Sequence, residues 1–194
     1  MRRHLADGKK TLLLGGEHLI TWAAVRAMRE RHEDLHLVVF DAHADLSDPY
    51  RRMRLSHACT VRLCHEELGA DRIFLLGVRT GTREDRRFIK ERLCLHPREV
   101  PAALVRRLRD KPVYVSVDLD VLDPASAPGV TTPQLRGWTF EMLDRALDRL
   151  RGLRRIVGAD VVELCPPYDP AGVTALMGAE VARKLLFLMD RAKG

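Results

Sequence analysis

The sequence of 194 residues predicts an α/β protein in three layers, with helices on both faces of a mainly parallel β-sheet. Two observations predict this class. Short apolar runs, typical of buried strands, alternate with longer segments whose apolar residues recur at helical spacing. Acidic residues directly follow several of the apolar runs, and ligands of open α/β sheets bind outside the carboxyl ends of the strands.

The individual elements follow from these patterns. Strands are expected at residues 11–14, 36–40, 72–77, 113–117 and 155–162. Helices are expected at residues 20–31, 56–68, 82–93, 101–109, 139–149 and 171–191. Thr139 and Glu141 mark the start of the fifth helix, because they supply the side-chain chemistry typical of helix caps.

Composition predicts a single globular domain over residues 1–194, because 46% of the residues are hydrophobic and 31% are charged. No apolar stretch approaches the about 18 residues that indicate a membrane-spanning helix. The short apolar run after the basic amino end is unlike a signal peptide. The four cysteines have no paired Cys-x-x-Cys spacing, so we expect free thiols, a cytoplasmic protein and no membrane partner.

The formal net charge of +6 raises nucleic-acid binding as an option. However, the arginines are scattered, aromatic residues make up 5%, and no nucleic-acid-binding motif is present. We therefore expect no nucleic-acid partner. A basic protein does not attract a cation at long range, so any attraction for a cationic substrate must come from a local acidic site.

The segment Asp41-Ala42-His43-Ala44-Asp45 is the most informative part of the chain. It directly follows the apolar run at residues 37–40, which predicts a buried strand. Three side chains that can bind metal stand at alternate positions, and these share one face of an extended chain.

Two further motifs repeat this arrangement. Asp118 and Asp120 end the apolar run at residues 113–117, and His18 follows the run at residues 12–14 and a Gly15-Gly16 turn. A single Asp-x-Asp is more commonly a turn or a helix cap. The combination at three strand ends instead predicts one cluster of four aspartates and two histidines.

The residue types in this cluster predict a metal centre. Four neighbouring carboxylates repel one another unless cations lie among them, and two divalent ions would match their charge. Oxygen-rich ligands with some imidazole suit Mn²⁺ better than the thiolate sets that select zinc or iron–sulfur clusters. Two ions about 3.5–4 Å apart can hold a bridging hydroxide near neutral pH, so the predicted chemistry is metal-assisted hydrolysis.

The chain resembles the ureohydrolase family of arginases, agmatinases and related amidinohydrolases. Four motifs, in the order of the family, carry the resemblance: GGEH at residues 15–18, FDAHAD at 40–45, SVDLDVLDP at 116–124 and DVVE at 160–163. The resemblance implies an arginase-like three-layer fold and two Mn²⁺ per subunit. It also implies hydrolysis of a guanidino group, with release of urea.

The resemblance also implies a role for each matching residue. One Mn²⁺ would be held by His18, Asp41, Asp45 and Asp118, and the other by Asp41, His43, Asp118 and Asp120. Asp45 would also steady the bridging hydroxide.

Two further residues carry roles implied by the family. Glu163 would face the guanidinium of a small cationic substrate. His57 would transfer protons, a role that an ordinary pKa near 6.5 suits, although a histidine packed by chance near a helix start is the alternative interpretation.

The loop at residues 46–55 lacks the Asn and the Ser/Thr run with which arginases read an amino acid, and it resembles the agmatinase-like branch. Agmatine would give urea and a polyamine such as putrescine. Asp48 and Asp169 are candidates for reading a distal amine, but each is better explained as a turn residue beside proline.

Alternatives to agmatine remain open. Arg51, Arg52 and Arg54 could read a carboxylated substrate such as guanidinobutyrate, although a solvated surface run is the favoured interpretation. Arginase activity, or a catalytically impaired relative that serves as a binding or regulatory subunit, is also compatible with the motifs. Another metal-dependent α/β hydrolase would use one zinc and leave Glu163 without a role. Arg79, at a strand end, could reach the rim of the site or a neighbouring subunit, but a surface arginine is the favoured interpretation.

Compared with the family, the chain begins roughly 100 residues late, so the first strands of the family sheet are expected to be missing. Their absence would leave the edge of the strand at residues 11–14 open. We therefore expect lower stability, association through that edge into a homo-oligomer, or a need for another chain. A stable, monodisperse monomer in thermal unfolding and sizing would contradict this expectation.

Overall fold

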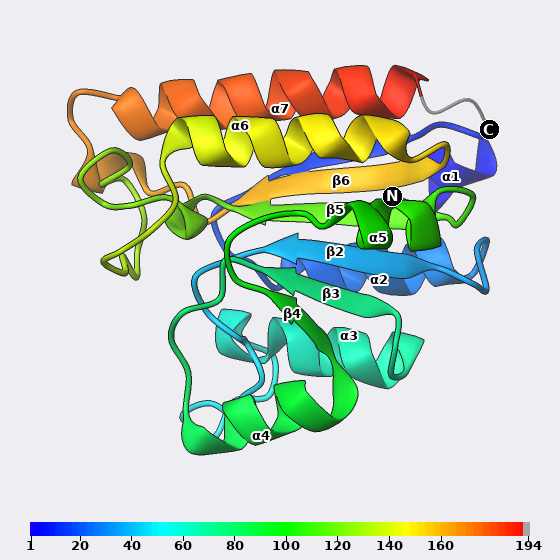
Figure 1. The fold of residues 1–194 in the computed structure, drawn as a ribbon, viewed down its shortest axis with the longest axis horizontal. Helices are drawn as coiled ribbons and strands as arrows, with labels where there is room; N and C mark the ends of the chain where they lie inside the picture. The colour runs from blue at the N-terminus through cyan, green and yellow to red at the C-terminus, as the bar shows by residue number, and fades with distance from the viewer. Residues whose placement is uncertain (192–194) are drawn as a thin grey trace.

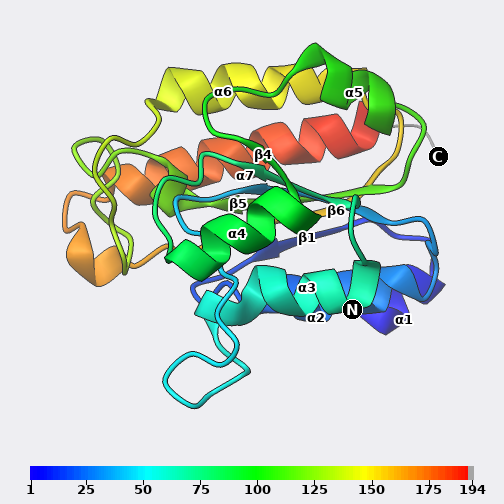
Figure 2. The same ribbon diagram turned by 60° about the horizontal axis from the view of Figure 1, so that its bottom comes forward.

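The computed structural model describes residues 1–191, which form one sheet of six parallel strands with helices on both faces (Figure 1). Helices α5, α6 and α7 cover one face, and α1, α2 and α3 cover the other (Figure 2). The predicted three-layer, mainly parallel α/β fold is thereby confirmed.

The strands are β1 Thr11–Leu14, β2 His36–Phe40, β3 Ile73–Leu76, β4 Cys94–His96, β5 Val113–Asp118 and β6 Ile156–Val162. The α-helices are α1 Arg2–Ala6, α2 Ile20–Arg29, α3 Thr60–Leu68, α4 Arg83–Arg92, α5 Ala102–Leu108, α6 Phe140–Arg149 and α7 Val173–Arg191. Short 3₁₀ segments are η1 His57–Cys59, η2 Leu119–Val121, η3 Leu150–Gly152 and η4 Pro166–Tyr168.

Every predicted strand and helix has a counterpart, and the differences lie at the ends. The helix expected from residue 56 opens as the 3₁₀ segment η1 before α3 begins, and Thr139 caps α6 by accepting a hydrogen bond from Met142 N. The sequence prediction missed α1 and β4. Both are short, and α1 buries only Leu5, so neither carries enough apolar residues to show a period.

The strand order β1-β6-β5-β2-β3-β4 places the ends of the four functionally marked strands next to one another. Phe40 pairs with Val117, Asp118 pairs with Val162, and Leu14 pairs with Val161, so these strands finish at nearly the same level. Because all strands point the same way, the loops after β1, β2, β5 and β6 meet at one edge of the sheet (Figure 1). β1 lies at an edge, as expected, and its Leu14 is exposed.

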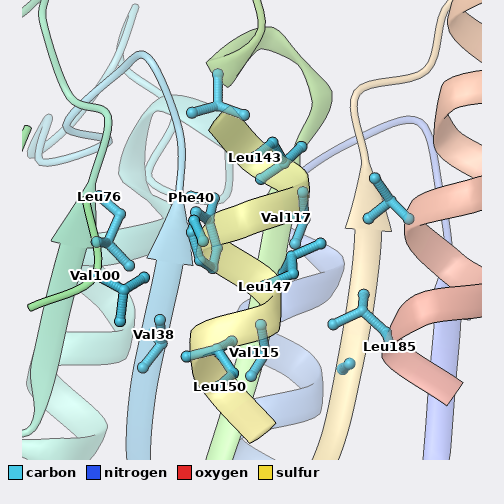
Figure 3. Close-up of a cluster of buried hydrophobic side chains, with 14 of the residues drawn as sticks. Val38, Phe40, Leu76, Val100, Val115, Val117, Leu143, Leu147, Leu150 and Leu185 are labelled. Atoms are coloured by element: carbon cyan, nitrogen blue, oxygen red, sulfur yellow. The ribbon is translucent and has the colours of Figure 1, made fainter. Parts of the chain in front are cut away.

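Both faces of the sheet are buried, as a parallel sheet between helices requires. Val38 and Phe40 of β2 point to the side of α6 and α7, whereas Leu37 and Val39 point to the side of α2 and α3. Figure 3 shows the first of these layers, in which Phe40 lies beside the side chains that α6 directs at the sheet. The strands are thus clamped from both sides, which gives the loops at their carboxyl ends a rigid base. Within residues 1–191, no helix combines the length and apolar character needed to cross a bilayer.

Candidate metal centre

The Asp41–Asp45 segment leaves β2 through a turn. Asp41 Oδ1 accepts a hydrogen bond of 2.6 Å from His43 N, and Asp45 has a φ of 49°. The expectation that the three side chains share one face of an extended chain is therefore wrong in detail. The aspartate side chain bonds the backbone two residues on, an arrangement that competes with extended structure and turns the chain.

The Asp118–Asp120 segment repeats the same local structure. Asp118 Oδ1 accepts a hydrogen bond of 2.8 Å from Asp120 N, at the step from β5 into η2. Asp120 Oδ1 in turn accepts from Ala42 N at 3.0 Å. Two turns, in each of which an aspartate accepts from the backbone two residues on, thus follow neighbouring strands and are joined by the bond from Ala42 N to Asp120 Oδ1. They direct carboxylates from both strands into one space.

His18 lies at the centre of one group of carboxylates. Its Nδ1 is 3.3 Å from Asp41 Oδ2, 3.1 Å from Asp45 Oδ2 and 3.2 Å from Asp118 Oδ2. His18, Asp41 and Asp118 are nearly inaccessible to solvent. His18 Nδ1 and Asp41 Oδ2 have no hydrogen-bond partner among the described residues. One imidazole nitrogen therefore faces three carboxylate oxygens, and two of these four atoms are buried without a partner.

A second group adjoins the first and shares Asp41. His43 Nδ1 is 2.7 Å from Asp120 Oδ2 and 3.6 Å from Asp41 Oδ1. This side is more open, because a quarter of the His43 side chain is exposed. Asp41, His43 and Asp120 form a set whose ligand atoms all lie within 4.8 Å of one another, as do His18, Asp41 and Asp118. Asp118 falls outside the second set, so its bridging role stays a prediction.

The charges in this cluster strongly perturb one another. Burial raises the pKa of Asp118, and the charges of Asp120 and Asp41 raise it further. Burial and the charge of Asp41 raise the pKa of Asp45 to about 7. Burial lowers the pKa of His43, but hydrogen bonds with Asp120 and Asp41 outweigh it and bring the value to about 11.

The donor set fits divalent cations. In this cluster, the two buried atoms without partners are an imidazole nitrogen, His18 Nδ1, and a carboxylate oxygen, Asp41 Oδ2, and these are donors that hard and borderline divalent ions accept. The carboxylates repel one another, and cations would remove that repulsion. Five residues, His18, Asp41, His43, Asp118 and Asp120, are therefore placed where they could hold metal. Asp45 falls outside both sets, although its Oδ2 is 3.1 Å from His18 Nδ1, so its ligand role stays a prediction.

Glu163 lies just beyond β6, with a φ of 61° that turns its side chain back over the strand ends. Its Oε1 accepts a hydrogen bond of 2.9 Å from His18 N, and its Oε2 accepts one of 2.5 Å from the Thr131 hydroxyl. The carboxylate is buried, and it lines the same cavity as the metal-type ligands. It is thus fixed beside them, as its predicted role requires.

His57 lies at the opening of the site. Its backbone N–H donates to Glu17 Oε1 at 2.6 Å, and its ring Nδ1 is 3.4 Å from the same oxygen. Glu17 Oε2 also accepts from Leu19 N at 2.6 Å, and the Tyr50 ring lies 5.8 Å from the His57 ring. The His57 side chain is 41% exposed, so it can meet a ligand that enters from solvent.

A cavity of about 230 Å³ unites these groups, smaller than the about 300–1,000 Å³ typical of pockets for drug-sized ligands. Its floor consists of His18, His43, Asp45, Asp118, Asp120 and Glu163. Its rim consists of Ala44, Leu46, Ser47, Tyr50, His57, Ala58, Thr80, Gly81, Asp85 and Thr132. Among the described residues that line it, none is a lysine or an arginine.

Several of these rim residues were not predicted from the sequence, among them Asp85. In the sequence, Asp85 indicates the start of a helix, because Thr82 and Asp85 form a capping box at the first turn of α4. Thr82 N donates to Asp85 Oδ2 at 2.7 Å, so the capping pattern explains the role of one carboxylate oxygen. The pattern gives no sign that Asp85 also lines the cavity. Glu17, which supports His57, lies in the GGEH motif at residues 15–18. Its position next to His18 could have marked it as a residue of the site.

The two weaker acidic candidates lie outside the cavity lining. Asp169 Oδ2 accepts a hydrogen bond from Thr174 N at the start of α7, and Asp48 pairs with Arg54 and Arg62. Their favoured interpretation as local structural residues agrees with these contacts. Arg51 and Arg52 are exposed, as a surface run predicts.

The prediction that Arg79 is an ordinary surface arginine is wrong. Its guanidinium is half-buried and donates to backbone carbonyls, including Asp120 O at 2.9 Å and Gln134 O at 2.8 Å. Gln134 Nε2 lies 3.2 Å from His43 Nε2. Arg79 therefore ties the Asp120 segment to the loop that backs His43, a role that depends on the folded loops and has no local sequence signal.

Comparison with known proteins gives the family. The profile of the arginase family matches residues 1–188. An agmatinase of Bacillus anthracis is 36% identical over 187 residues, which cover 94% of this chain and 64% of that protein. A guanidinobutyrase of Pseudomonas aeruginosa is 36% identical over 205 residues, which cover 96% of this chain and 63% of that protein.

The fold comparison agrees. A crystal structure from Clostridium difficile, described as a candidate agmatinase, superposes with a TM-score of 0.94 at 32% identity and covers 99% of this chain and 72% of that one. The chain therefore belongs to the arginase family. It spans less than two thirds of the length of the two curated relatives named above.

Proposed function

We propose that this chain is a dinuclear metal hydrolase that cleaves the guanidino group of agmatine, or of a close agmatine derivative, to release urea and an amine such as putrescine. The observation that carries the proposal is the charge of the cavity. Carboxylates form its floor, Asp85 adds another at the rim, and no lysine or arginine lines it among the described residues. Such a cavity favours a substrate that is cationic at both ends.

The six candidate ligands, His18, Asp41, His43, Asp45, Asp118 and Asp120, would hold two divalent ions, and the oxygen-rich set favours Mn²⁺. Ions held there lower the pKa of water and so supply a nucleophile near neutral pH. Asp45 would orient that water, since its carboxylate lies 3.1 Å from His18 Nδ1 and borders the cavity.

The chain's own residues would do the remaining work. Glu163 would pair with the guanidinium through a charge-assisted hydrogen bond, because the His18 N–H and the Thr131 hydroxyl fix its carboxylate. The guanidinium carbon would then lie over the floor. His57, at the opening, would give a proton to the amine that leaves, and Glu17 would hold its backbone in place.

A second candidate is a guanidinobutyrase. The P. aeruginosa guanidinobutyrase is as similar in sequence as the B. anthracis agmatinase, and its named substrate class carries a carboxylate where agmatine has an amine. Arg51 lies over the Tyr50 ring, which borders the cavity, with its guanidinium carbon 5.3 Å from the ring centre. Arg51 is therefore a candidate to bind such a carboxylate.

Urea release with added Mn²⁺ tests the proposal, with agmatine, 4-guanidinobutyrate and arginine compared at equal concentration. The proposal expects agmatine to be the best substrate and Asp118→Ala to be inactive on all three. A preference for guanidinobutyrate that is lost in Arg51→Ala would favour the second candidate. Silence on every substrate, with Mn²⁺ bound, would contradict both.

A further inference from the structure

A chain of buried polar side chains runs from His18 away from the cavity. His18 Nε2 is 3.1 Å from Ser116 Oγ, which is 3.3 Å from Thr21 Oγ1. The Thr21 hydroxyl donates to Asp160 Oδ2 at 2.7 Å, and the Tyr114 hydroxyl donates to the same oxygen at 2.9 Å. Each of these side chains is essentially inaccessible to solvent. His18 lies in the loop before α2, and the others come from α2, β5 and β6, so the fold itself assembles the chain.

Asp160 is the unusual member of this chain. It stands inside β6, between Ala159 and Val161, in a strand that is otherwise apolar or glycine. Burying a carboxylate is costly unless it is well paired, and aspartate is disfavoured within strands. Two hydroxyls satisfy Oδ2, while Oδ1 has no hydrogen-bond partner among the described residues. A carboxylate at this position therefore needs an explanation beyond packing.

The direction of the hydrogen bonds supplies one. His18 Nδ1 faces carboxylates of Asp41, Asp45 and Asp118, so a cation among them requires a lone pair on Nδ1. The proton of the neutral ring then stands on Nε2, which donates to Ser116.

The donations then continue in one direction. The Ser116 hydroxyl can donate to Thr21, and the Thr21 hydroxyl donates to Asp160. Every donor in the chain thus points from the cavity toward Asp160, the one member that only accepts when ionised.

We propose that Asp160 is a positioning residue that acts through Thr21 and Ser116. It would hold the His18 ring in the orientation and the tautomer that present Nδ1 to a divalent cation. The inference rests on the proposed metal centre and adds a support beyond the ligands. Histidine ligands commonly donate their second ring N–H to a carboxylate or carbonyl, which makes the imidazole a better ligand. Here two hydroxyls carry that link. Loss of Asp160 should weaken only the ion that His18 holds. The histidine at the other ion, His43, has a different partner, Gln134.

Mn²⁺ binding to Asp160→Asn tests the inference, measured by equilibrium dialysis and by electron paramagnetic resonance. The amide keeps the size of the side chain but removes the charge. We expect the affinity for one ion to fall by about 10–100-fold, the range found for such outer contacts, while the other ion is retained. The resonance should change from that of a coupled pair to that of an isolated Mn²⁺.

Two further variants separate positioning from packing. Tyr114→Phe removes a hydroxyl from the same Asp160 oxygen but leaves the link to His18 intact, so it should bind two ions like the wild type. Thr21→Val removes the link and keeps the side-chain shape, so it should reproduce the loss seen in Asp160→Asn. Thr21→Val also carries the test if Asp160→Asn does not fold.

Wild-type affinity for both ions in Asp160→Asn or in Thr21→Val would overturn the inference. An equal loss in Tyr114→Phe would also overturn it, because it would show that the network acts only through stability. Wild-type chain that binds no Mn²⁺ would overturn the proposed function itself, and the inference with it.

Discussion

The floor and the rim of the cavity are built differently. The floor is formed by side chains that follow strand ends and are mostly buried, and hydrogen bonds from backbone N–H groups fix Asp118, Asp120 and Glu163. The rim is formed by loops and helix starts, and residues such as His57 and Tyr50 are partly exposed. On the proposed function, the floor would determine the chemistry, whereas the rim would determine which substrate is accepted.

Breaking the floor should have the largest effect. Asp118→Ala removes an oxygen that faces His18 and the anchor of the Asp120 turn, so urea release should be abolished, a greater loss than the about 10–100-fold typical of outer contacts.

In metal-free protein, the less disruptive Asp118→Asn should raise Tm, because it relieves repulsion from Asp120 and Asp41. Calorimetry and urea assays on the two variants check both results. A lower Tm for metal-free Asp118→Asn would show that repulsion is not the main strain in the floor.

Glu163→Gln should have the next largest effect. The amide can still accept the hydrogen bond from His18 N but loses the charge that, on the proposed function, would pair with the guanidinium. A hydrogen bond to a charged group is worth about 1.5–3 kcal/mol, so kcat/KM should fall about 10–100-fold while the Mn²⁺ content stays unchanged. Glu66→Gln, which alters an exposed ion pair with Arg54, is the matched control and should leave kinetics unaltered. Loss of Mn²⁺ from Glu163→Gln would instead make Glu163 part of the metal centre.

Mn²⁺ should stabilise the protein, and more so at higher pH. Binding at about 100 times Kd adds about 2.7 kcal/mol, or a Tm shift of about 5–10 °C for a chain of this size.

The pH dependence follows from the raised pKa of Asp45. Burial and the charge of Asp41 move this pKa from 3.8 to about 7, so the folded, metal-free chain binds a proton that the unfolded chain has lost. Stability of the metal-free protein should therefore fall as pH rises from about 4 to about 7. Metal replaces that proton, so the Mn²⁺-induced shift should grow over the same range. Scanning calorimetry with and without Mn²⁺ would show this, and a shift that shrinks with rising pH would contradict it.

Changing the rim should have the smallest effect and the most selective one. Asp85→Asn can preserve the helix cap but removes the one rim carboxylate, so KM for agmatine should rise several-fold, with KM for 4-guanidinobutyrate unchanged or lower. Asp48→Asn makes the same change outside the cavity lining and should not alter KM. If the two variants behave alike, Asp85 does not read the substrate.

The sequence predicted the floor because metal-type residues stood directly after apolar runs. The register that aligns Phe40 with Val117 then brings Asp41 and Asp118 together without any loop geometry being known. The local route was not foreseen, because the turn that Asp41 makes with His43 N replaces the extended chain that the alternation suggested.

The rim could not be predicted in the same way. Asp85 lies far from the metal motifs in sequence, and its capping pattern already explained it. Arg79 was taken for a surface residue because its partners are backbone carbonyls, such as Asp120 O and Gln134 O. Every residue type carries a backbone carbonyl, so the sequence does not reveal such partners. The short strand β4 and helix α1 were missed for a related reason, because three and five residues are too few to establish a period.

The most direct test of the central claim is the number of Mn²⁺ ions bound per chain at saturation, determined by elemental analysis after equilibrium dialysis. Two neighbouring ligand sets that share Asp41 predict two ions per chain, and fewer in Asp118→Ala. A wild-type chain that binds one ion or none, while it remains folded, would contradict the assignment of the floor as a dinuclear metal centre.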